Sequence, residues 1–257
     1  MASPQEDLRA FQGYFQQRFP DVPLNSFVNG AYAIDAKLRA QWHALMQFPP
    51  YSFALDRGKQ LFHTAFDNGS SYAGCLANGG VGIKQNYPYF DTKTDKVVTL
   101  ALAINRCRTE NGEQPLPYKT GDMAAILAYM AYTSRGNAID IKIPQDPAAL
   151  AAYRAGKEFY YSRHGQLNFS CASCHVQNAG KRLRAETLSP ALGPPASFPV
   201  YRSKWGGMGT LHRRFSGCLR LIRAEPFPPQ SQTYRNLEYF LMYMSNGLPV
   251  AGPASRP

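Results

Sequence analysis

Five consecutive residues, Cys171-Ala-Ser-Cys174-His175, restrict this chain more than any other feature of its sequence. The spacing C-x-x-C-H is the attachment signature of c-type haem. Cys171 and Cys174 lie about one helical turn apart, so each thiol can form a thioether to the haem, and His175 can turn its imidazole to the iron. The sequence has no second cysteine or histidine pair at zinc-finger spacing, and the neighbourhood reads as helical rather than βαβ. We therefore predict one covalently bound haem c.

The motif also predicts where the protein works, because haem c is attached outside the cytoplasm. We expect a periplasmic protein whose signal peptide has been removed, since the opening residues MASPQEDLRAFQGYF lack the apolar core of a secretory signal. No stretch of the sequence approaches the roughly 20 consecutive apolar residues that a membrane-spanning helix needs. We expect no membrane span.

The chain contains an internal repeat with a constant offset of 111 residues. The stretch TLALAINRCRTENGEQPLP, which begins at Thr99, aligns with TLHRRFSGCLRLIRAEPFP, which begins at Thr210. Cys107 thereby aligns with Cys218. A constant offset of this kind indicates a duplicated unit, and we refer to its two halves as the first and the second copy.

Upstream of this alignment, only the second copy keeps the haem motif. GKQLF at 58–62 resembles GKEFY at 156–160, and each segment precedes a cysteine. The first copy then reads CLANG where the second reads CASCH, which sets Asn78 and Gly79 opposite the second thioether cysteine and the iron-binding histidine. The first copy is therefore expected to hold no haem.

Helical periodicity dominates the rest of the chain. Asp146 as N-cap and Pro147 at the first position open a helix that Gly165 can end. The segment SQTYRNLEYFLMYMSNG carries an apolar stripe that stops at Gly247. Its counterpart in the first copy, TGDMAAILAYMAYTSRG, carries one that stops at Gly136. A further amphipathic helix near the start, DAKLRAQWHALM, aligns Leu38, Trp42 and Leu45.

These patterns predict a mainly α fold with two tandem cytochrome c-like domains, the first without haem, and long loops. Residues 1–50 are expected to form an N-terminal extension with a helix. Residues 51–145 are expected to form the degenerate, haem-less domain, and residues 146–257 the haem-binding domain with the active site. The second copy has a longer segment between its motif and Cys218, rich in proline, glycine and basic residues, which we interpret as a functional surface.

The two cysteines of the first copy, Cys75 and Cys107, are not part of a haem-attachment motif. In an oxidising compartment their expected fate is a disulfide bond. Two buried free thiols are the alternative.

The sixth ligand of the iron is open to several residues, namely Met208, His212, Cys218 and His164. A methionine ligand raises the haem potential and is usual in electron carriers, whereas a thiolate lowers it and makes the site more reactive. Cys218 aligns with a cysteine in the first copy, and its arginine neighbours would lower its thiol pKa; these are Arg213, Arg214 and Arg220. A buried inert thiol or an intermolecular disulfide is the alternative reading of Cys218.

Charge points to an anionic partner or substrate. The formal net charge is +11 at pH 7, and between Lys181 and Arg223 nine basic residues stand against the single acid Glu186. Such a field attracts a small anion. Aromatic residues for base stacking are few there, chiefly Tyr201 and Trp205, which argues against a nucleic-acid surface.

Several segments together resemble the SoxA family, the catalytic cytochrome subunits of the SoxAX complexes of bacterial thiosulfate oxidation. They are CASCH, YRSKWGGMGTLHRRFSGC, NYPYFD and INRCRTENGEQPLPY, and the likeness runs from about residue 25 to 247. The resemblance implies His175 and Cys218 as axial ligands, a persulfide on Cys218 and Arg214 in the active site. CLANG departs from the two-haem members and implies the single-haem subgroup, in which Cys75 and Cys107 pair.

The family's activity, carried over, would make this chain a haem-dependent L-cysteine S-thiosulfotransferase. It would join thiosulfate oxidatively to a cysteine of the carrier protein SoxYZ and pass electrons through haem to SoxX, its heterodimer partner. The alternative is a plain periplasmic electron-transfer c-type cytochrome, with Met208 or a histidine as sixth ligand. A non-catalytic haem sensor with Cys218 as a ligand switch is a third reading.

Overall fold

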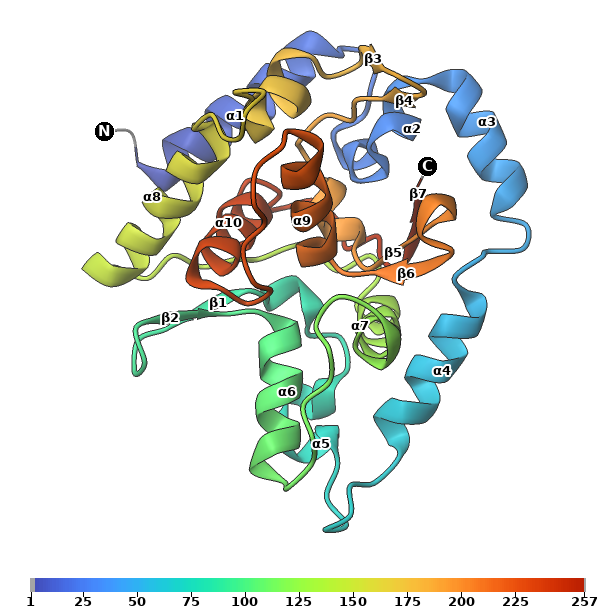
Figure 1. Ribbon diagram of the computed structural model, residues 1–257, viewed down its shortest axis with the longest axis vertical. Helices are drawn as coiled ribbons and strands as arrows, with labels where there is room; N and C mark the ends of the chain where they lie inside the picture. Colours follow the sequence, from blue (N-terminus) through green and yellow to red (C-terminus); the bar gives the residue numbers. More distant parts are fainter. Residues whose placement is uncertain (1–2, 257) are drawn as a thin grey trace.

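The computed structural model describes residues 3–256 and is mainly helical (Figure 1). Its longer helices are α1 (Pro4–Arg18), α3 (Ala36–Leu45), α4 (Ser52–His63), α6 (Leu100–Glu110), α7 (Gly121–Thr133), α8 (Pro147–Tyr161), α9 (Leu211–Leu221) and α10 (Gln232–Tyr243). Single turns form α2 (Ala31–Ile34) and α5 (Tyr72–Cys75). Across residues 3–256, no helix combines the length and the apolar composition that crossing a bilayer requires.

The strands are only two or three residues long. They are β1 (Tyr89–Asp91), β2 (Lys96–Val98), β3 (Arg182–Leu183), β4 (Glu186–Thr187), β5 (Val200–Arg202), β6 (Gly207–Gly209) and β7 (Ala254–Arg256). β1 pairs with β2 and β3 with β4, both antiparallel, while β5 lies between antiparallel β6 and parallel β7. Strands this short show no readable alternation, so the sequence did not reveal that the basic segment of the second copy is built on them.

The internal repeat reappears in the helices. α6 and α9 begin at the same offset, each after a threonine N-cap whose hydroxyl accepts a backbone hydrogen bond, Thr99 from Leu102 and Thr210 from Arg213. α7 and α10 begin at that offset too. Cys107 and Cys218 therefore occupy equivalent positions on equivalent helices.

A glycine allows the same close helix crossing in each copy. α4 packs against α7, and α8 packs against α10. A Cβ on Gly58 would lie 1.9 Å from the Ala125 carbonyl oxygen, and one on Gly156 would lie 2.0 Å from the Asn236 carbonyl oxygen. Because no side chain fits in that space, the glycine shared by GKQLF and GKEFY is explained by backbone packing.

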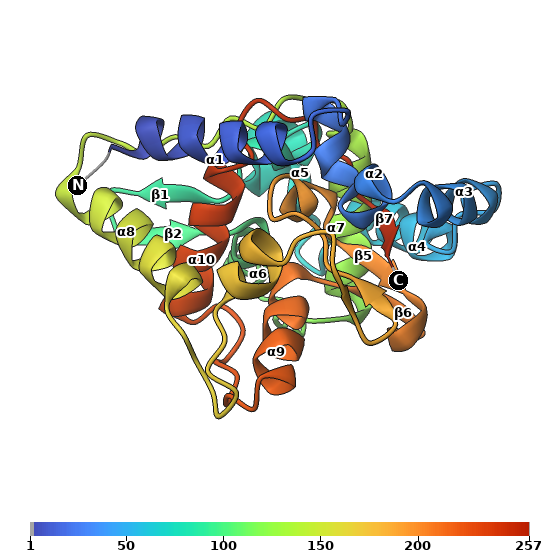
Figure 2. The ribbon, with the colours of Figure 1, turned by 90° about the horizontal axis from the view of Figure 1, so that it is seen from above.

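The apolar core has two main parts, and the hairpin of β1 and β2 joins them. α8, α9 and α10 surround the larger cluster, and α6 and α7 line the smaller one. Phe90 and Val97 of the hairpin pack into the larger cluster, whereas Val98 packs into the smaller one. The N-terminal helix α1 contacts α8 through Asp7, which accepts from Tyr153 and Lys157, and covers the larger cluster with Phe11 and Phe15 (Figures 1 and 2).

The N-terminal extension holds more helix than the sequence analysis assigned. Helix α3 is confirmed at Ala36–Leu45, but none of its residues is buried; Trp42 stacks on Tyr32 with ring centroids 5.2 Å apart. Helix α1 was missed, although a capping box opens it, in which the Ser3 hydroxyl accepts from Glu6 N–H and the Glu6 carboxylate accepts from Ser3 N–H. The packed helix of the extension is α1, not α3.

The glycines that were expected to end two helices lie beyond their last turns. α8 ends at Tyr161 and α10 at Tyr243, each several residues before Gly165 and Gly247. Gly165 has a φ of +68°, and a Cβ there would lie 2.2 Å from the Ile222 carbonyl oxygen. Gly165 is needed for this close approach of two loops rather than as a helix stop.

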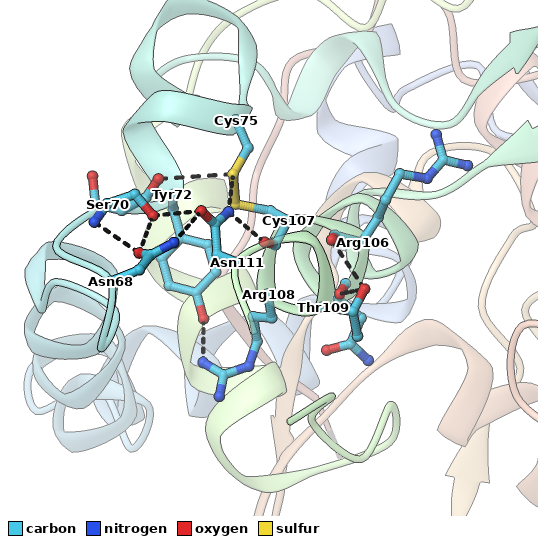
Figure 3. The surroundings of a disulfide bond; sticks show 11 residues. Asn68, Ser70, Tyr72, Cys75, Arg106, Cys107, Arg108, Thr109 and Asn111 are labelled. Atoms are coloured by element: carbon cyan, nitrogen blue, oxygen red, sulfur yellow. Dashed lines mark hydrogen bonds between the residues drawn. A yellow bond between two sulfur atoms is a disulfide. The ribbon is translucent and has the colours of Figure 1, made fainter. Parts of the chain in front are cut away.

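The disulfide predicted in the first copy is confirmed. Cys75 and Cys107 are bonded, with Cα atoms 5.6 Å apart, and link α5 to α6 (Figure 3). Asn111 supports the bridge, since its Nδ2 donates to the Cys107 carbonyl oxygen at 2.8 Å and to Cys75 Sγ at 3.4 Å. The remaining cysteines, all in the second copy, are free.

Removing this bridge is expected to loosen the first copy alone. A Cys75→Ala, Cys107→Ala double variant frees a loop of 32 residues in the unfolded chain, a loss of roughly 3–4 kcal/mol in the chain-entropy model. Thermal unfolding by circular dichroism should show an earlier transition, while the haem absorbance of the folded protein stays unchanged. An unchanged melting profile would mean that the bridge is not structural.

Candidate functional site

The C-x-x-C-H motif lies on a short helical segment that passes from α to π geometry. Ser173–Gln177 form a π-helical turn, η4, directly after the α-helical residues Cys171 and Ala172. Single π-turns are uncommon and concentrate at functional sites. The turn carries Cys174 and His175, so the three predicted haem-binding side chains come from one continuous segment.

The backbone of the following loop orients the His175 imidazole. His175 Nδ1 donates to the Ser189 carbonyl oxygen at 2.9 Å. The Ala191 N–H donates in turn to the His175 carbonyl oxygen at 3.0 Å. A carbonyl at Nδ1 fixes the tautomer and leaves Nε2 available as a ligand.

Cys218 lies on α9, opposite the motif. The His175 imidazole is one of the groups that lower the pKa of its thiol. Cys171 and Cys174 lie near it, because burial and then the charge on Cys218 raise the pKa of both thiols. The structure thus brings together the four sulfur and nitrogen donors that the motif and the repeat single out.

The charges around Cys218 favour its thiolate. Burial raises the pKa of the Cys218 thiol, but Arg214, followed by His175 and Arg202, outweighs burial and brings the pKa down to about 7. A thiol with this pKa is substantially ionised at neutral pH, and the thiolate is the form that binds metals and attacks sulfur. Arg214 lies one helical turn before Cys218 on α9, as the sequence predicts for a helical segment.

The other candidates for the sixth ligand are engaged elsewhere. Met208 packs with Tyr51 and two alanines of α7. His212 is buried, accepts from the Gln230 N–H at Nδ1 and lies 3.0 Å from Glu238 through Nε2. The His164 ring stacks on Phe159, and its Nε2 bonds to the Phe159 carbonyl oxygen at 3.1 Å. Of the four candidates, only Cys218 faces His175.

The arginines around Cys218 are not the set that the sequence singled out. Arg213 turns away and lies over the Trp205 ring, 4.4 Å from its centroid, and Arg220 is exposed in the last turn of α9. The second arginine that acts on the Cys218 thiol is Arg202 on β5. Sequence neighbours on a helix point in different directions, so adjacency along the chain identified Arg214 but not Arg202.

The Tyr160 hydroxyl tests whether these residues fit a haem. It is buried without a hydrogen-bond partner among the described residues. Burial, followed by the charge on Cys171, raises the pKa of this hydroxyl well above its ordinary value. The influence of Cys171 places the hydroxyl beside the haem motif. An unpaired buried hydroxyl costs about 1–3 kcal/mol. The equivalent residue of the first copy is Phe62, which has no hydroxyl. This contrast, together with three free cysteines beside an oriented histidine, fits a haem in the second copy and none in the first.

Arg18 is a site residue that the sequence analysis missed. It closes helix α1, and its guanidinium donates to the carbonyl oxygens of Val176 and Ala179, each at 2.8 Å. These carbonyls belong to the end of η4 and the loop after it. The N-terminal extension is therefore hydrogen-bonded to the segment that carries the haem motif. This contact joins residues that are far apart in the sequence, so only the fold reveals it.

Comparisons with known proteins agree with this geometry. The SoxA/TsdA cytochrome c domain matches residues 57–139, which belong to the first copy and lack the haem motif. The chain is 54% identical to the L-cysteine S-thiosulfotransferase subunit SoxA of Allochromatium vinosum, over 99% of this chain and 91% of that one. It is 53% identical to the subunit of the same name from Chlorobaculum tepidum, over 97% and 87%.

A solved structure shares the fold as well as the sequence. The crystal structure of SoxXA from P. pantotrophus superposes with a TM-score of 0.74 at 36% identity, covering 81% of this chain and 79% of that one. A c-type haem is consistent with both the cytochrome c domain and these relatives. On this similarity over nearly its whole length, the chain belongs to the SoxA family of L-cysteine S-thiosulfotransferase subunits.

Proposed function

We propose that this chain is the catalytic haem subunit of an L-cysteine S-thiosulfotransferase. The observation that carries the proposal is the convergence of Cys218 and Arg214 on the haem-attachment motif, in a chain whose relatives carry that enzyme's name. Thiosulfate would be joined to a cysteine of the carrier protein SoxYZ. A plain electron carrier is less well supported, because Met208 and His212 are engaged away from His175.

The reaction balances as the formation of one sulfur–sulfur bond. The carrier thiol and the thiosulfate dianion give an S-thiosulfonate adduct, one proton and two electrons. A haem held by the motif would supply the electron-transfer chemistry for these electrons, and SoxX would receive them. The chain's own residues bind and orient the reactants: Cys218 offers a thiolate at the sulfur-binding point, and the Arg214 guanidinium neutralises the charge of the sulfonate.

One haem c would be held covalently in the second copy. Cys171 and Cys174 would hold it through thioethers, and His175 and Cys218 would bind its iron. Support comes from the free thiols of the motif, from the Ser189 carbonyl that orients His175, and from the missing motif in the first copy. The persulfide on Cys218 belongs to the same proposal.

The domain division also remains a proposal, with an extension over 1–50, a haem-less cytochrome c-like domain over 51–145 and a haem-binding one over 146–257. The matched glycine crossings at Gly58 and Gly156 support two copies of one architecture. SoxX is proposed as heterodimer partner because the similar solved structure is a SoxXA complex. The periplasm is the proposed location.

The test is a reconstitution of the holo-complex of this chain and SoxX with thiosulfate, SoxYZ and ferricytochrome c. We expect two electrons per adduct formed, and a mass gain of one thiosulfate group on the carrier cysteine. The tryptic peptide with Cys218 should carry one extra sulfur. A holo-complex that reduces its acceptor without forming the adduct would leave this chain an electron carrier only.

A further inference from the structure

We infer that Arg202 supplies a second guanidinium to the anion site beside Cys218, and that Glu186 positions both Arg202 and Arg214. Arg202 would be a binding residue and Glu186 a positioning residue. The inference rests on the proposed function, since it concerns the same site and its thiosulfate. It goes further because it identifies the residues that define the oxyanion subsite.

Glu186 bridges the two arginines with separate oxygen atoms. Its Oε1 accepts from Arg202 Nη2 at 3.0 Å, and its Oε2 lies 3.8 Å from Arg214 Nη2. Arg202 comes from β5, Arg214 from α9 and Glu186 from the β3–β4 hairpin. One carboxylate thus fixes the separation of two guanidiniums that belong to different elements.

Arg202 is held rigidly. Only 4% of its surface is exposed, and its strand is paired on both sides, by β6 and by β7. Its guanidinium lies 5.3 Å from the centroid of the Trp205 ring. A buried arginine at the centre of a sheet costs desolvation, which is tolerated where its charge meets an anion.

Two guanidiniums suit thiosulfate better than one. The ion is a dianion with three sulfonate oxygens, and each guanidinium presents paired N–H donors to such oxygens. Arg214 lies one helical turn before Cys218 on α9, and Glu186 links Arg202 to Arg214, so an anion whose terminal sulfur lies at the thiol would turn its other end toward this pair. Glu186 offsets one of the two positive charges, and its side chain is 38% exposed.

The experiment uses holo-complexes with Arg202→Gln, Arg202→Lys, Glu186→Gln and, as control, Arg220→Gln. Arg220→Gln removes the same charge from an exposed position of α9. Calorimetry measures the thiosulfate Kd directly, and turnover with SoxYZ gives kcat and KM. Loss of a charge-assisted bond should raise the Kd and KM of Arg202→Gln by about 10- to 100-fold, with a smaller change in kcat. Arg202→Lys should recover part of the affinity, and Arg220→Gln should bind as wild type does.

The positioning role of Glu186 has its own readout. Because Glu186 acts through the arginines, the Kd changes of Arg202→Gln and Glu186→Gln should be less than additive in the double variant. Additive changes would overturn the positioning role. Wild-type affinity in Arg202→Gln, or an equal loss in Arg220→Gln, would overturn the binding role. The Kd measurement tests the roles of Arg202 and Glu186 even if the wild-type complex shows no turnover. Absence of turnover in the wild type would refute the proposed function and not these two roles.

Discussion

Gly156→Ala is expected to destabilise the second copy by about 3 kcal/mol or more. The added Cβ would lie 2.0 Å from the Asn236 carbonyl oxygen and 3.0 Å from Phe240 Cβ, so α8 and α10 must separate. Backbone atoms cannot turn aside as a side chain end can, and overpacking of this kind exceeds the usual cost of one extra methyl group. Thermal unfolding of the holoprotein, followed by Soret absorbance, should show a melting temperature lower by several degrees.

Two further glycines provide matched controls. Gly58→Ala creates the same clash in the first copy, 1.9 Å from the Ala125 carbonyl oxygen, and should lower the circular dichroism transition more than the Soret transition. Gly13 lies inside α1 with no atom within 4 Å of an added Cβ. Gly13→Ala should therefore raise stability by roughly 0.5–1 kcal/mol through helix propensity. A Gly156→Ala protein that melts like the wild type would refute the account of the crossing.

The sequence predicted the features that local spacing or repetition encodes. The haem motif, the repeat that aligns Cys107 with Cys218, and the Cys75–Cys107 bridge are all legible in one dimension. Caps are local too, and the N-cap Asp146 is found where it was predicted. The capping box of α1 was equally legible and was overlooked.

What could not be predicted depends on contacts between distant elements. Arg202 is placed at the site by strand β5, which pairs with its neighbour β6 and also with β7. Strand β7 lies more than fifty residues further along the sequence. Arg18 binds carbonyls more than 150 residues downstream. Glu186 stood out only as the single acid in a basic segment, and its bridge to two arginines follows from a hairpin too short to leave a pattern. Functional side chains on short strands and loops are placed by tertiary structure, so the sequence points to Cys218 and Arg214 as candidates but not to the residues that surround them.

Cys218→Ser is expected to lower the turnover of the holo-complex by at least about a thousandfold. Serine keeps the size and the α9 backbone, but its hydroxyl does not ionise near neutral pH, whereas the charges of Arg214, His175 and Arg202 bring the Cys218 thiol to a pKa of about 7 despite its burial. The haem should remain attached, since Cys171 and Cys174 are unchanged, while its absorbance shifts because an axial ligand differs. Steady-state thiosulfate oxidation measures the turnover, and the pyridine haemochrome spectrum measures how much haem stays attached. The absorption spectrum of the native holoprotein measures the shift that the changed ligand causes.

The Cys75→Ala, Cys107→Ala double variant is the matched control, because it removes two cysteines of the first copy without touching the site. It should turn over thiosulfate like the wild type below its lowered melting temperature. If Cys218→Ser were as active as that control, with an unshifted haem spectrum, Cys218 would be neither ligand nor sulfur acceptor. Loss of turnover with an unshifted spectrum would instead show that Cys218 does not bind the iron but does take part in the sulfur chemistry. The two measurements therefore test separately the two roles that we assign to this thiol.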